Sequence, residues 1–552
     1  MNVAQLVGKT LAELGVGHCF GVVGSGNFAI TNALIEHGVP YTSARHEGGA
    51  ATMADAYART SGQVALLSVH QGCGLTNAAT GIGEAAKSRT PLIVLAAEAA
   101  PSAVYSNFAM DQDGFAASVY AVPERVHSAA SAVADTMRAY KRAVNDRRTV
   151  VLNLPLNVQG QEITEEHSEF PVALSRAEPI RPSRASVAAL AQLIGQAERP
   201  VFIAGRGGRG AKEAILALAR HTGALVATSA VAKGLFNEDE FNLGISGGFS
   251  SPLAAELITG ADLILAFGCA LNMWTMRHGH LIGEATAVIQ IDVEDQALGA
   301  NRPIDLGLVG DSSQCAIDTL RELQRQGIGQ RIGYRTEAVS ERIASSIHWS
   351  QVDYQDLSDA QRIDPRTLTK ALDAILPAER IVSVDSGNFM GYPSQFLSVP
   401  DEFGFCFTQA FQSIGLGLYT AIGAALAQPG RMPVLGTGDG GFHMAIAELD
   451  TAVRLGLPLV CIVYNDAAYS AEVHHFGVAH PEADMSSVQF PDSDFAAIGR
   501  GFGADGITVR TLADLSAVQT WLDSKPDKPL VIDAKIASDS GSWWLAEAFK
   551  GH

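Results

Sequence analysis

The sequence lacks any long hydrophobic run: no stretch approaches the 18 or so uninterrupted apolar residues of a membrane-spanning helix. The N-terminal MNVAQLVGKTLAELGV reads as an amphipathic helix and has no signal-peptide core. Nor is there an acidic tail or a basic block, because the net charge of −19 is spread along the chain. This negative balance disfavours nucleic acid and anionic membranes as partners. We therefore expect a soluble, cytoplasmic protein.

Cysteine is scarce, with six residues that form no CxxC pair and no zinc-ligand spacing. Several of them lie in apolar runs, which indicates buried free thiols in a reducing compartment. The positions are Cys19, Cys73, Cys269, Cys315, Cys406 and Cys461.

Charged residues make up only 18% of the chain and apolar residues 47%, a balance that excludes disorder and supports sizeable cores. Apolar strand patterns separated by helical ones predict parallel doubly wound sheets. Strands are expected at 18–23, 40–43, 64–69, 91–96 and 149–154, then at 201–204, 225–228, 263–267 and 287–292, and finally at 381–384, 433–436, 459–464 and 530–534. Polar stretches at 160–186 and about 324–363 would connect three units, of which the first and third could share a fold.

The segment 436–472 holds the most specific chemistry. An apolar run ends at a glycine cluster with Asp439, a helical pattern follows with Met444 and Leu449 on its apolar face, and the next apolar run ends at Asn465-Asp466. A strand–helix–strand crossover makes the two strands parallel, so Asp439 and Asp466 should lie close together at one sheet edge. Two carboxylates beside glycine-rich backbone suit a hard divalent cation and the phosphate that it neutralises.

Three further positions have a functional and a structural interpretation. Glu47 follows a strand and enters apolar surroundings, which would raise its pKa for proton transfer to a ring nitrogen, although a helix-capping acid is common there. His70 begins a glycine-bracketed loop at a strand end, and Ser25 lies in a Gly-Ser-Gly turn that could alone explain it. Glu472, His474 and His475 follow the acidic segment, where either histidine could be a solvated surface residue.

The turn 205–210, GRGGRG, satisfies the GxGxxG pattern of dinucleotide sites. No acid for a ribose follows about 20 residues later, so a plain tight turn into a helix is favoured. Its two arginines, Arg206 and Arg209, could still meet an anionic ligand.

Five blocks together resemble thiamin-diphosphate-dependent enzymes of the acetolactate synthase, pyruvate decarboxylase and benzoylformate decarboxylase group. They are RHEGGAATMADAYAR, GCGLTN, IDVEDQALGANRPIDLGLVGD, QSIGLGLYTAIGAALAQP, and GDGGF with YND. The resemblance implies an α/β fold of three doubly wound parallel-sheet domains: pyrimidine-binding at 1–165, middle at 186–325, and diphosphate-binding at 362–552. It also implies thiamin diphosphate with Mg²⁺ (or Ca²⁺), while FAD in the middle domain is an alternative that is not favoured.

The resemblance also implies residue roles. Glu47 would contact the aminopyrimidine and promote formation of the ylid. Mg²⁺ would be held by Asp439, Asp466 and the carbonyl of Ala468, unless a register slip of one makes Asn465 the ligand. The other cofactor contacts would be Asn388, Gln412, Ile414, Gly438, Gly440, Gly441 and Tyr469. Substrate-side catalytic groups would be Ser25, His70, Gln112, Glu472 and His474.

The implied activity is decarboxylation of a 2-oxo acid, or its ligation to a second carbonyl, through a carbanion-enamine. One alternative keeps the cofactor and cleaves a carbon–carbon bond of a cyclic diketone or a 2-hydroxyacyl thioester without decarboxylation. Another is a flavin or nicotinamide oxidoreductase that uses the 205–210 turn, and a non-catalytic binding protein is least favoured. The resemblance places Glu47 and the diphosphate site across a subunit interface, so a homodimer or homotetramer is expected.

Overall fold

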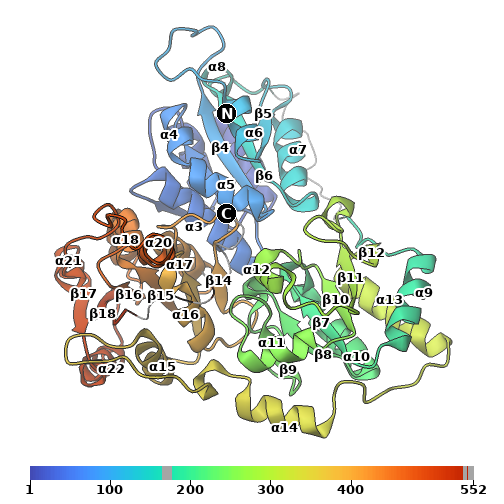
Figure 1. Cartoon of the computed structure of the whole chain (residues 1–552). Coiled ribbons are helices and arrows are strands. Elements are labelled where there is room, and N and C mark those ends of the chain that lie inside the picture. Colours follow the sequence, from blue (N-terminus) through green and yellow to red (C-terminus); the bar gives the residue numbers. More distant parts are fainter. Residues whose placement is uncertain (165–176, 539–541, 543, 545–552) are drawn as a thin grey trace.

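The computed structural model describes residues 1–164, 177–538, 542 and 544. The described chain forms three six-stranded, wholly parallel sheets, each flanked by helices, which confirms the predicted α/β class (Figure 1). None of the helices in these described ranges is long and apolar enough to cross a membrane. The domain boundaries expected above remain predictions, and the expected linker at 160–186 lies partly outside the described residues.

The first sheet has the order β2-β1-β3-β4-β6-β5. Its strands are β1 (His18–Gly21), β2 (Tyr41–Ser43), β3 (Ala65–Val69), β4 (Leu92–Glu98), β5 (Val122–Arg125) and β6 (Thr149–Pro155). Its helices are α1 (Val3–Glu13), α2 (Phe28–Glu36), α3 (Glu47–Ser61), α4 (Cys73–Asn77), α5 (Ala79–Lys87), α6 (Gln112–Ser118), α7 (Ala132–Asn145) and α8 (Leu156–Gln159).

The middle sheet has the order β12-β11-β10-β7-β8-β9, with a reversal between β7 and β10. Its strands are β7 (Pro200–Ala204), β8 (Leu225–Thr228), β9 (Asn242–Ile245), β10 (Leu263–Phe267), β11 (Ala287–Asp292) and β12 (Leu306–Val309). The main helices are α9 (Arg184–Gln196), α10 (Lys212–Thr222), α11 (Pro252–Thr259), α12 (Met273–Met276) and α13 (Ser312–Arg325).

The third sheet, β14-β13-β15-β16-β18-β17, repeats the strand order of the first, so the two domains share one topology, as the sequence suggested. Its strands are β13 (Arg380–Val384), β14 (Phe405–Phe407), β15 (Met432–Gly438), β16 (Val460–Asn465), β17 (Asp505–Val509) and β18 (Leu530–Lys535). Its helices are α15 (Pro365–Ile375), α16 (Gly391–Phe396), α17 (Gly417–Ala427), α18 (Asp439–Ala445), α19 (Leu449–Arg454), α20 (Ser470–Ala479), α21 (Phe495–Gly501) and α22 (Leu515–Asp523).

One local prediction is wrong. The helix expected after Asp439 is broken into α18, a short 3₁₀ turn at Ile446–Glu448 and α19. Met444, expected on the apolar face of that helix, is 50% exposed, while Leu449 is buried as predicted. The polar connector expected at about 324–363 contains α14 (Glu337–Ser346), which lies at the bottom of Figure 1.

The first and third domains pack together through α3 and α17. Small residues along both helices allow close approach: a Cβ added at Gly423 of α17 would lie 2.2 Å from the carbonyl oxygen of Met53 on α3. Buried side chains of the two helices, such as Ala50 and Ile422, belong to one continuous core. This core fixes the loops that enter α3 and α17, and both loops carry predicted site residues.

Candidate cofactor and catalytic site

Predicted cofactor residues gather at the carboxyl ends of the third sheet. Asn388 follows β13, Gln412 follows β14, Asp439 follows β15 and Asp466 follows β16. The reversal of strand order beside β13 and β15 is where doubly wound sheets bind ligands. These side chains line a cavity of about 1090 Å³, together with Ile414, Gly438, Gly440, Gly441, Ala468, Tyr469 and Glu472.

Asp439 and Asp466 form a pair of partly desolvated carboxylates. Burial, reinforced by the charge of Asp466, raises the pKa of Asp439 to about 7. Burial also raises the pKa of Asp466, whose carboxylate accepts a hydrogen bond from the Ser470 hydroxyl. A divalent cation would relieve this repulsion. Ala468 borders the same cavity, so its carbonyl could supply a third oxygen.

The described residues contain no group of three or more His, Cys, Asp or Glu side chains arranged for a metal ion. The predicted site has only two carboxylates, and its remaining ligands would be a backbone carbonyl and phosphate oxygens. All of these are oxygen donors, which Mg²⁺ and Ca²⁺ prefer. The donor set therefore fits the expected cation.

Asn465 and Asp466 have different environments. The Asn465 amide is buried and donates to Asp533 Oδ1 at 2.9 Å, while its oxygen accepts from the backbone N–H of Ala467. Asp466 borders the cavity, and Asn465 does not. Of the two alternatives left open by the sequence, the geometry favours Asp466 as the ligand and Asn465 as the residue that holds the turn.

The glycines beside Asp439 keep space that side chains would fill. A Cβ at Gly440 would lie 2.3 Å from the Tyr469 ring, and one at Gly441 would lie 2.5 Å from Asp385 Oδ2. Both glycines border the cavity, so their backbone is open to a ligand. This cradle fits a diphosphate group held next to the acid pair.

The loop after β14 brings Gln412 and Ile414 to the same cavity. Gln412 has a φ of +56°, a left-handed conformation that is uncommon outside glycine. The end of the loop is held by Asp385, which accepts a hydrogen bond from the Gly415 N–H at 2.9 Å. Gln412 and Ile414, which are predicted to contact the middle of the cofactor, thus lie on a constrained turn.

A second group of predicted residues occupies the corresponding edge of the first sheet. Ser25 follows β1, Glu47 begins α3 after β2, and His70 follows β3. Ser25 Oγ lies 3.3 Å from His70 Nε2, and Asn77 donates a hydrogen bond to Glu47 Oε2 at 3.1 Å. None of these three residues borders the large cavity.

Two predicted catalytic residues, Gln112 and His474, do not border the cavity. Gln112 is buried, accepts from the Gly72 N–H at 3.1 Å and donates to Asn153 Oδ1 at 2.7 Å, so it holds the loop after His70. His474 is half-buried on α20, where burial lowers its pKa, and it does not border the cavity. Their catalytic roles remain predictions.

The group of Ser25, Glu47 and His70 and the cavity with Asp439 and Asp466 are two half-sites. Exposed apolar side chains lie near each of them. Phe108 is 41% exposed, and its ring lies 4.8 Å from that of His70. Beside the cavity, Phe411 is 42% and Met444 50% exposed. Apolar surface clustered around functional residues is typical of a protein interface. Within one chain, Glu47 does not border the cavity that holds the acid pair.

Comparison with known families agrees with this geometry. Three family models match in order: the N-terminal thiamine pyrophosphate (TPP) binding domain of thiamine pyrophosphate enzymes at residues 1–118, the central domain at 187–323, and the C-terminal TPP binding domain at 385–534. The chain belongs to the thiamine pyrophosphate enzyme family. Thiamine pyrophosphate is thiamin diphosphate, the cofactor that the sequence predicts.

Relatives of this thiamine pyrophosphate enzyme differ in their named activities. The chain is 26% identical over 599 residues to a sulfoacetaldehyde acetyltransferase of Roseovarius nubinhibens, covering all of this chain and 94% of the relative. It is 29% identical to a probable 2-ketoarginine decarboxylase of Pseudomonas aeruginosa, covering 94% and 91% of the two chains. It is 27% identical to a probable acetolactate synthase large subunit of Methanocaldococcus jannaschii, covering 91% and 86%.

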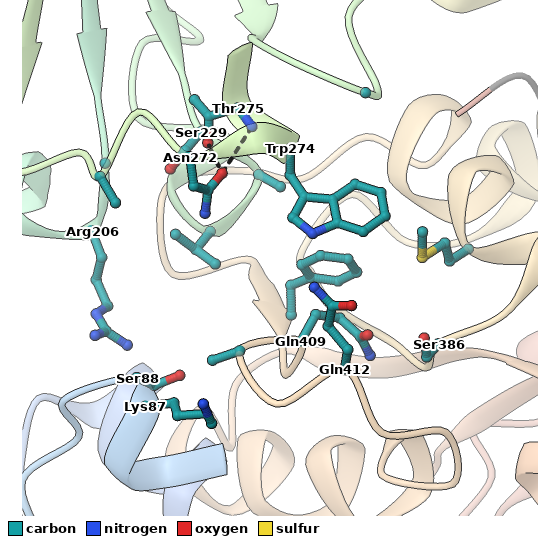
Figure 2. A pocket seen from close by; sticks show the side chains of 18 of the residues that line it. Lys87, Ser88, Arg206, Ser229, Asn272, Trp274, Thr275, Ser386, Gln409 and Gln412 are labelled. Atoms are coloured by element: carbon teal, nitrogen blue, oxygen red, sulfur yellow. Dashed lines mark hydrogen bonds between the residues drawn. The ribbon is translucent and has the colours of Figure 1, made fainter. Parts of the chain in front are cut away.

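The middle domain of this TPP enzyme also lines the cavity, including Gly205, Arg206, Gly207 and Arg209 of the 205–210 turn, and the first domain contributes residues such as Lys87 and Ser88. Figure 2 shows Arg206 extending from that turn towards Lys87 and Ser88 of the first domain. A Cβ at Gly205 would lie 2.2 Å from the Gly268 carbonyl oxygen, so close packing against the neighbouring strand end explains this glycine. Neither that packing nor the family match indicates a flavin.

Sequence reasoning missed three buried acids around the site: Asp385, Glu84 and Glu448. Asp385 supports the cofactor loop, and burial raises its pKa to about 6. Asp385 directly follows an apolar strand, and this position could have identified it from the sequence as a candidate site residue. Glu84 and Glu448 lie in helical patterns, and their backbone partners in the other domain are more than 300 residues away in sequence, so no local pattern distinguishes them from surface glutamates.

Proposed function

We propose that this chain is a thiamin-diphosphate- and Mg²⁺-dependent enzyme that decarboxylates a small 2-oxo acid, or joins the resulting fragment to a second carbonyl. The observation that carries the proposal is the Asp439–Asp466 pair, of which Asp439 is buried and Asp466 half-buried, beside the glycine cradle at the ends of β15 and β16. When bound there, thiamin diphosphate would supply the electron sink that accepts charge when a bond next to a carbonyl breaks.

Residues of this chain would bind the cation and the cofactor and would transfer the protons. Asp439, Asp466 and the Ala468 carbonyl would bind the cation. The backbone of Gly440 and Gly441 would bind the diphosphate.

Ile414 would support the middle of the cofactor, and the Gln412 carbonyl would accept a hydrogen bond from its ring. Glu47 would exchange a proton with a ring nitrogen of the cofactor. The Ser25–His70 pair, within hydrogen-bond reach of each other, would move a proton at the substrate oxygen. Glu472, which borders the cavity, is the second candidate for that role.

We further propose a homodimer or homotetramer in which Glu47 of one subunit faces the cavity of another. The exposed apolar residues around both half-sites support this arrangement. All six cysteines are free, which is consistent with a reducing compartment such as the cytoplasm.

A second candidate function is carbon–carbon cleavage without decarboxylation. It would act on a cyclic diketone or a 2-hydroxyacyl thioester. The observation that favours this candidate is the exposed Ser25 hydroxyl, which lies 3.3 Å from His70 Nε2. Such a hydroxyl–imidazole pair could also transfer protons on these substrates.

Substrate tests distinguish the two functions. The protein, supplied with thiamin diphosphate and Mg²⁺, is incubated with pyruvate, benzoylformate, branched-chain oxo acids and 2-ketoarginine, and carbon dioxide is measured. Parallel incubations contain a cyclic diketone or a 2-hydroxyacyl thioester. The Glu47→Gln protein is the control for background decay. Carbon dioxide from at least one oxo acid supports the first function. Turnover in the parallel incubations alone supports the second, and no turnover anywhere would contradict both.

A further inference from the structure

Two fully buried glutamates cross the contact between the first and third domains in opposite directions. Glu84 lies on α5 of the first domain and binds the third. Glu448 lies between α18 and α19 of the third domain and binds the first. Neither is a predicted cofactor or substrate contact.

Glu84 binds the loop that enters the cofactor cavity. Its Oε1 accepts the backbone N–H of Ala410 at 3.0 Å, and its Oε2 accepts that of Phe411 at 2.6 Å. The next residue is Gln412, and Ile414 follows two positions later. Arg59, which is itself buried, compensates the charge of Glu84 at 2.7 Å. Arg59 also donates to the Phe407 carbonyl oxygen at the start of the same loop.

Glu448 makes the converse contact. Its Oε1 accepts the backbone N–H groups of Arg45 at 2.8 Å and His46 at 2.9 Å, immediately before Glu47. A Cβ at Gly49 would lie 2.8 Å from the same oxygen, so glycine is required for this approach. The Thr451 hydroxyl donates a hydrogen bond to Oε2 at 2.5 Å, so both oxygens of the carboxylate accept hydrogen bonds.

The two contacts fall on equivalent segments. The Arg45–His46 turn follows β2, and the Ala410–Phe411 turn follows β14. These strands occupy the same edge position in two sheets of identical order. Each turn leads into one of the two packed helices, α3 and α17. In each case a carboxylate from the other domain accepts two consecutive N–H groups just before a residue assigned to the cofactor.

We propose that Glu84 and Glu448 are positioning residues with separate tasks, an inference that rests on the proposed function. Glu84 fixes the loop that presents Gln412 and Ile414, and so determines how firmly the cofactor is held. Glu448 fixes the turn that presents Glu47, and so determines how quickly the bound cofactor loses its reactive proton. Charged acceptors make the stronger class of hydrogen bond, which suits them to hold short loops.

The test compares Glu84→Gln and Glu448→Gln in the full-length protein with Mg²⁺. Two quantities are measured without any substrate: the dissociation constant of thiamin diphosphate by calorimetry, and the rate of deuterium exchange at its thiazolium carbon at saturating cofactor. Glu84→Gln is expected to raise the dissociation constant about tenfold and to change the exchange rate by no more than about twofold, because one N–H then faces an amide donor. Glu448→Gln is expected to slow exchange about tenfold and to leave the dissociation constant within about twofold.

Asp450→Asn is the matched control. Asp450 lies two positions from Glu448 and binds the Arg45 side chain at 2.6 Å, so this change removes a charge at the same contact without freeing a backbone N–H. Both quantities should stay at the wild-type value. If a glutamine variant does not fold, the aspartate variant at the same position, which withdraws the acceptor by one methylene, should show the same separation.

The expected separation of the two effects supports separate positioning roles. If both quantities change together in both variants, or if neither changes, the inference is overturned while the proposed function stands. Failure of the wild-type protein to bind thiamin diphosphate would overturn the proposed function, and the inference with it.

Discussion

At the scale of single residues, the acid pair determines what this site can hold. Asp439 and Asp466 lie where burial and mutual repulsion disfavour two negative charges, so the pair is poised for a cation. Replacing Asp466 by Asn removes one charge but keeps the shape of the side chain. We expect thiamin diphosphate affinity in Mg²⁺ to fall about 100-fold, or about 2.7 kcal/mol, as measured by calorimetry. Asp450→Asn is the control, and unchanged affinity in the Asp466 variant would exclude that residue as a ligand.

The same pair predicts a pH dependence. Burial raises the pKa of Asp439 to about 7, well above its value of about 3.9 in an unfolded chain. In the metal-free protein, stability from this group is therefore greatest below the unfolded value and is lost as pH rises towards 7. Because cation binding requires the ionised carboxylate, Mg²⁺ with thiamin diphosphate should raise the melting temperature more at pH 7.5 than at pH 5.5. Equal shifts at the two pH values would contradict a titrating Asp439 ligand.

The sequence predicts residues that follow strand ends better than residues that act at a distance. Asp439 and Asp466 were expected to be neighbours because a parallel crossover brings strand ends together, and the structure places them in one cavity. Glu84 and Glu448 could not be predicted in this way, because their roles depend on domain packing and not on a local pattern.

At the scale of elements, the strands that the sequence missed are β5, β9, β12, β14 and β17, and all of them are edge strands. Central strands are covered on both faces and form continuous apolar runs. Edge strands are short and partly exposed, as in β5 with the sequence VPER and β17 with DGITV, so they carry weak apolar signals. The interior strands were thus predictable from the sequence, whereas every edge strand except β2 required the structure.

The contact between α3 and α17 gives an element-scale prediction. A methyl group at Gly423 would press against the Met53 carbonyl oxygen and separate the two helices. We expect Gly423→Ala to destabilise the protein by about 1–3 kcal/mol. Denaturant unfolding measures this change. Gly430→Ala, at a turn with no atom within 4 Å of the added Cβ, is the control and should have little effect. Equal stability of the two variants would show that the helices do not need this close approach.

At the scale of the whole molecule, one chain holds two half-sites that do not meet. Ser25, Glu47 and His70 lie at the edge of the first sheet, while Asp439, Asp466 and Ile414 border the cavity of the third. Exposed apolar side chains lie beside both half-sites, Phe108 at the first and Phe411 and Met444 at the second, which suits a second copy of the chain bringing them together. We expect sedimentation to show dimers or tetramers, and fully active monomers would contradict this assembly.

Co-expression of Glu47→Gln and Asp439→Asn chains tests the shared site most directly. Each variant alone should lack rapid deuterium exchange at the thiazolium carbon of added thiamin diphosphate. In random dimers half the molecules are hybrids, and one of the two sites in each hybrid joins an intact Glu47 to an intact Asp439, so about a quarter of wild-type exchange should return. If each chain contained its own complete site, mixing would restore nothing, and exchange that stayed at the level of the separate variants would contradict a site built between subunits.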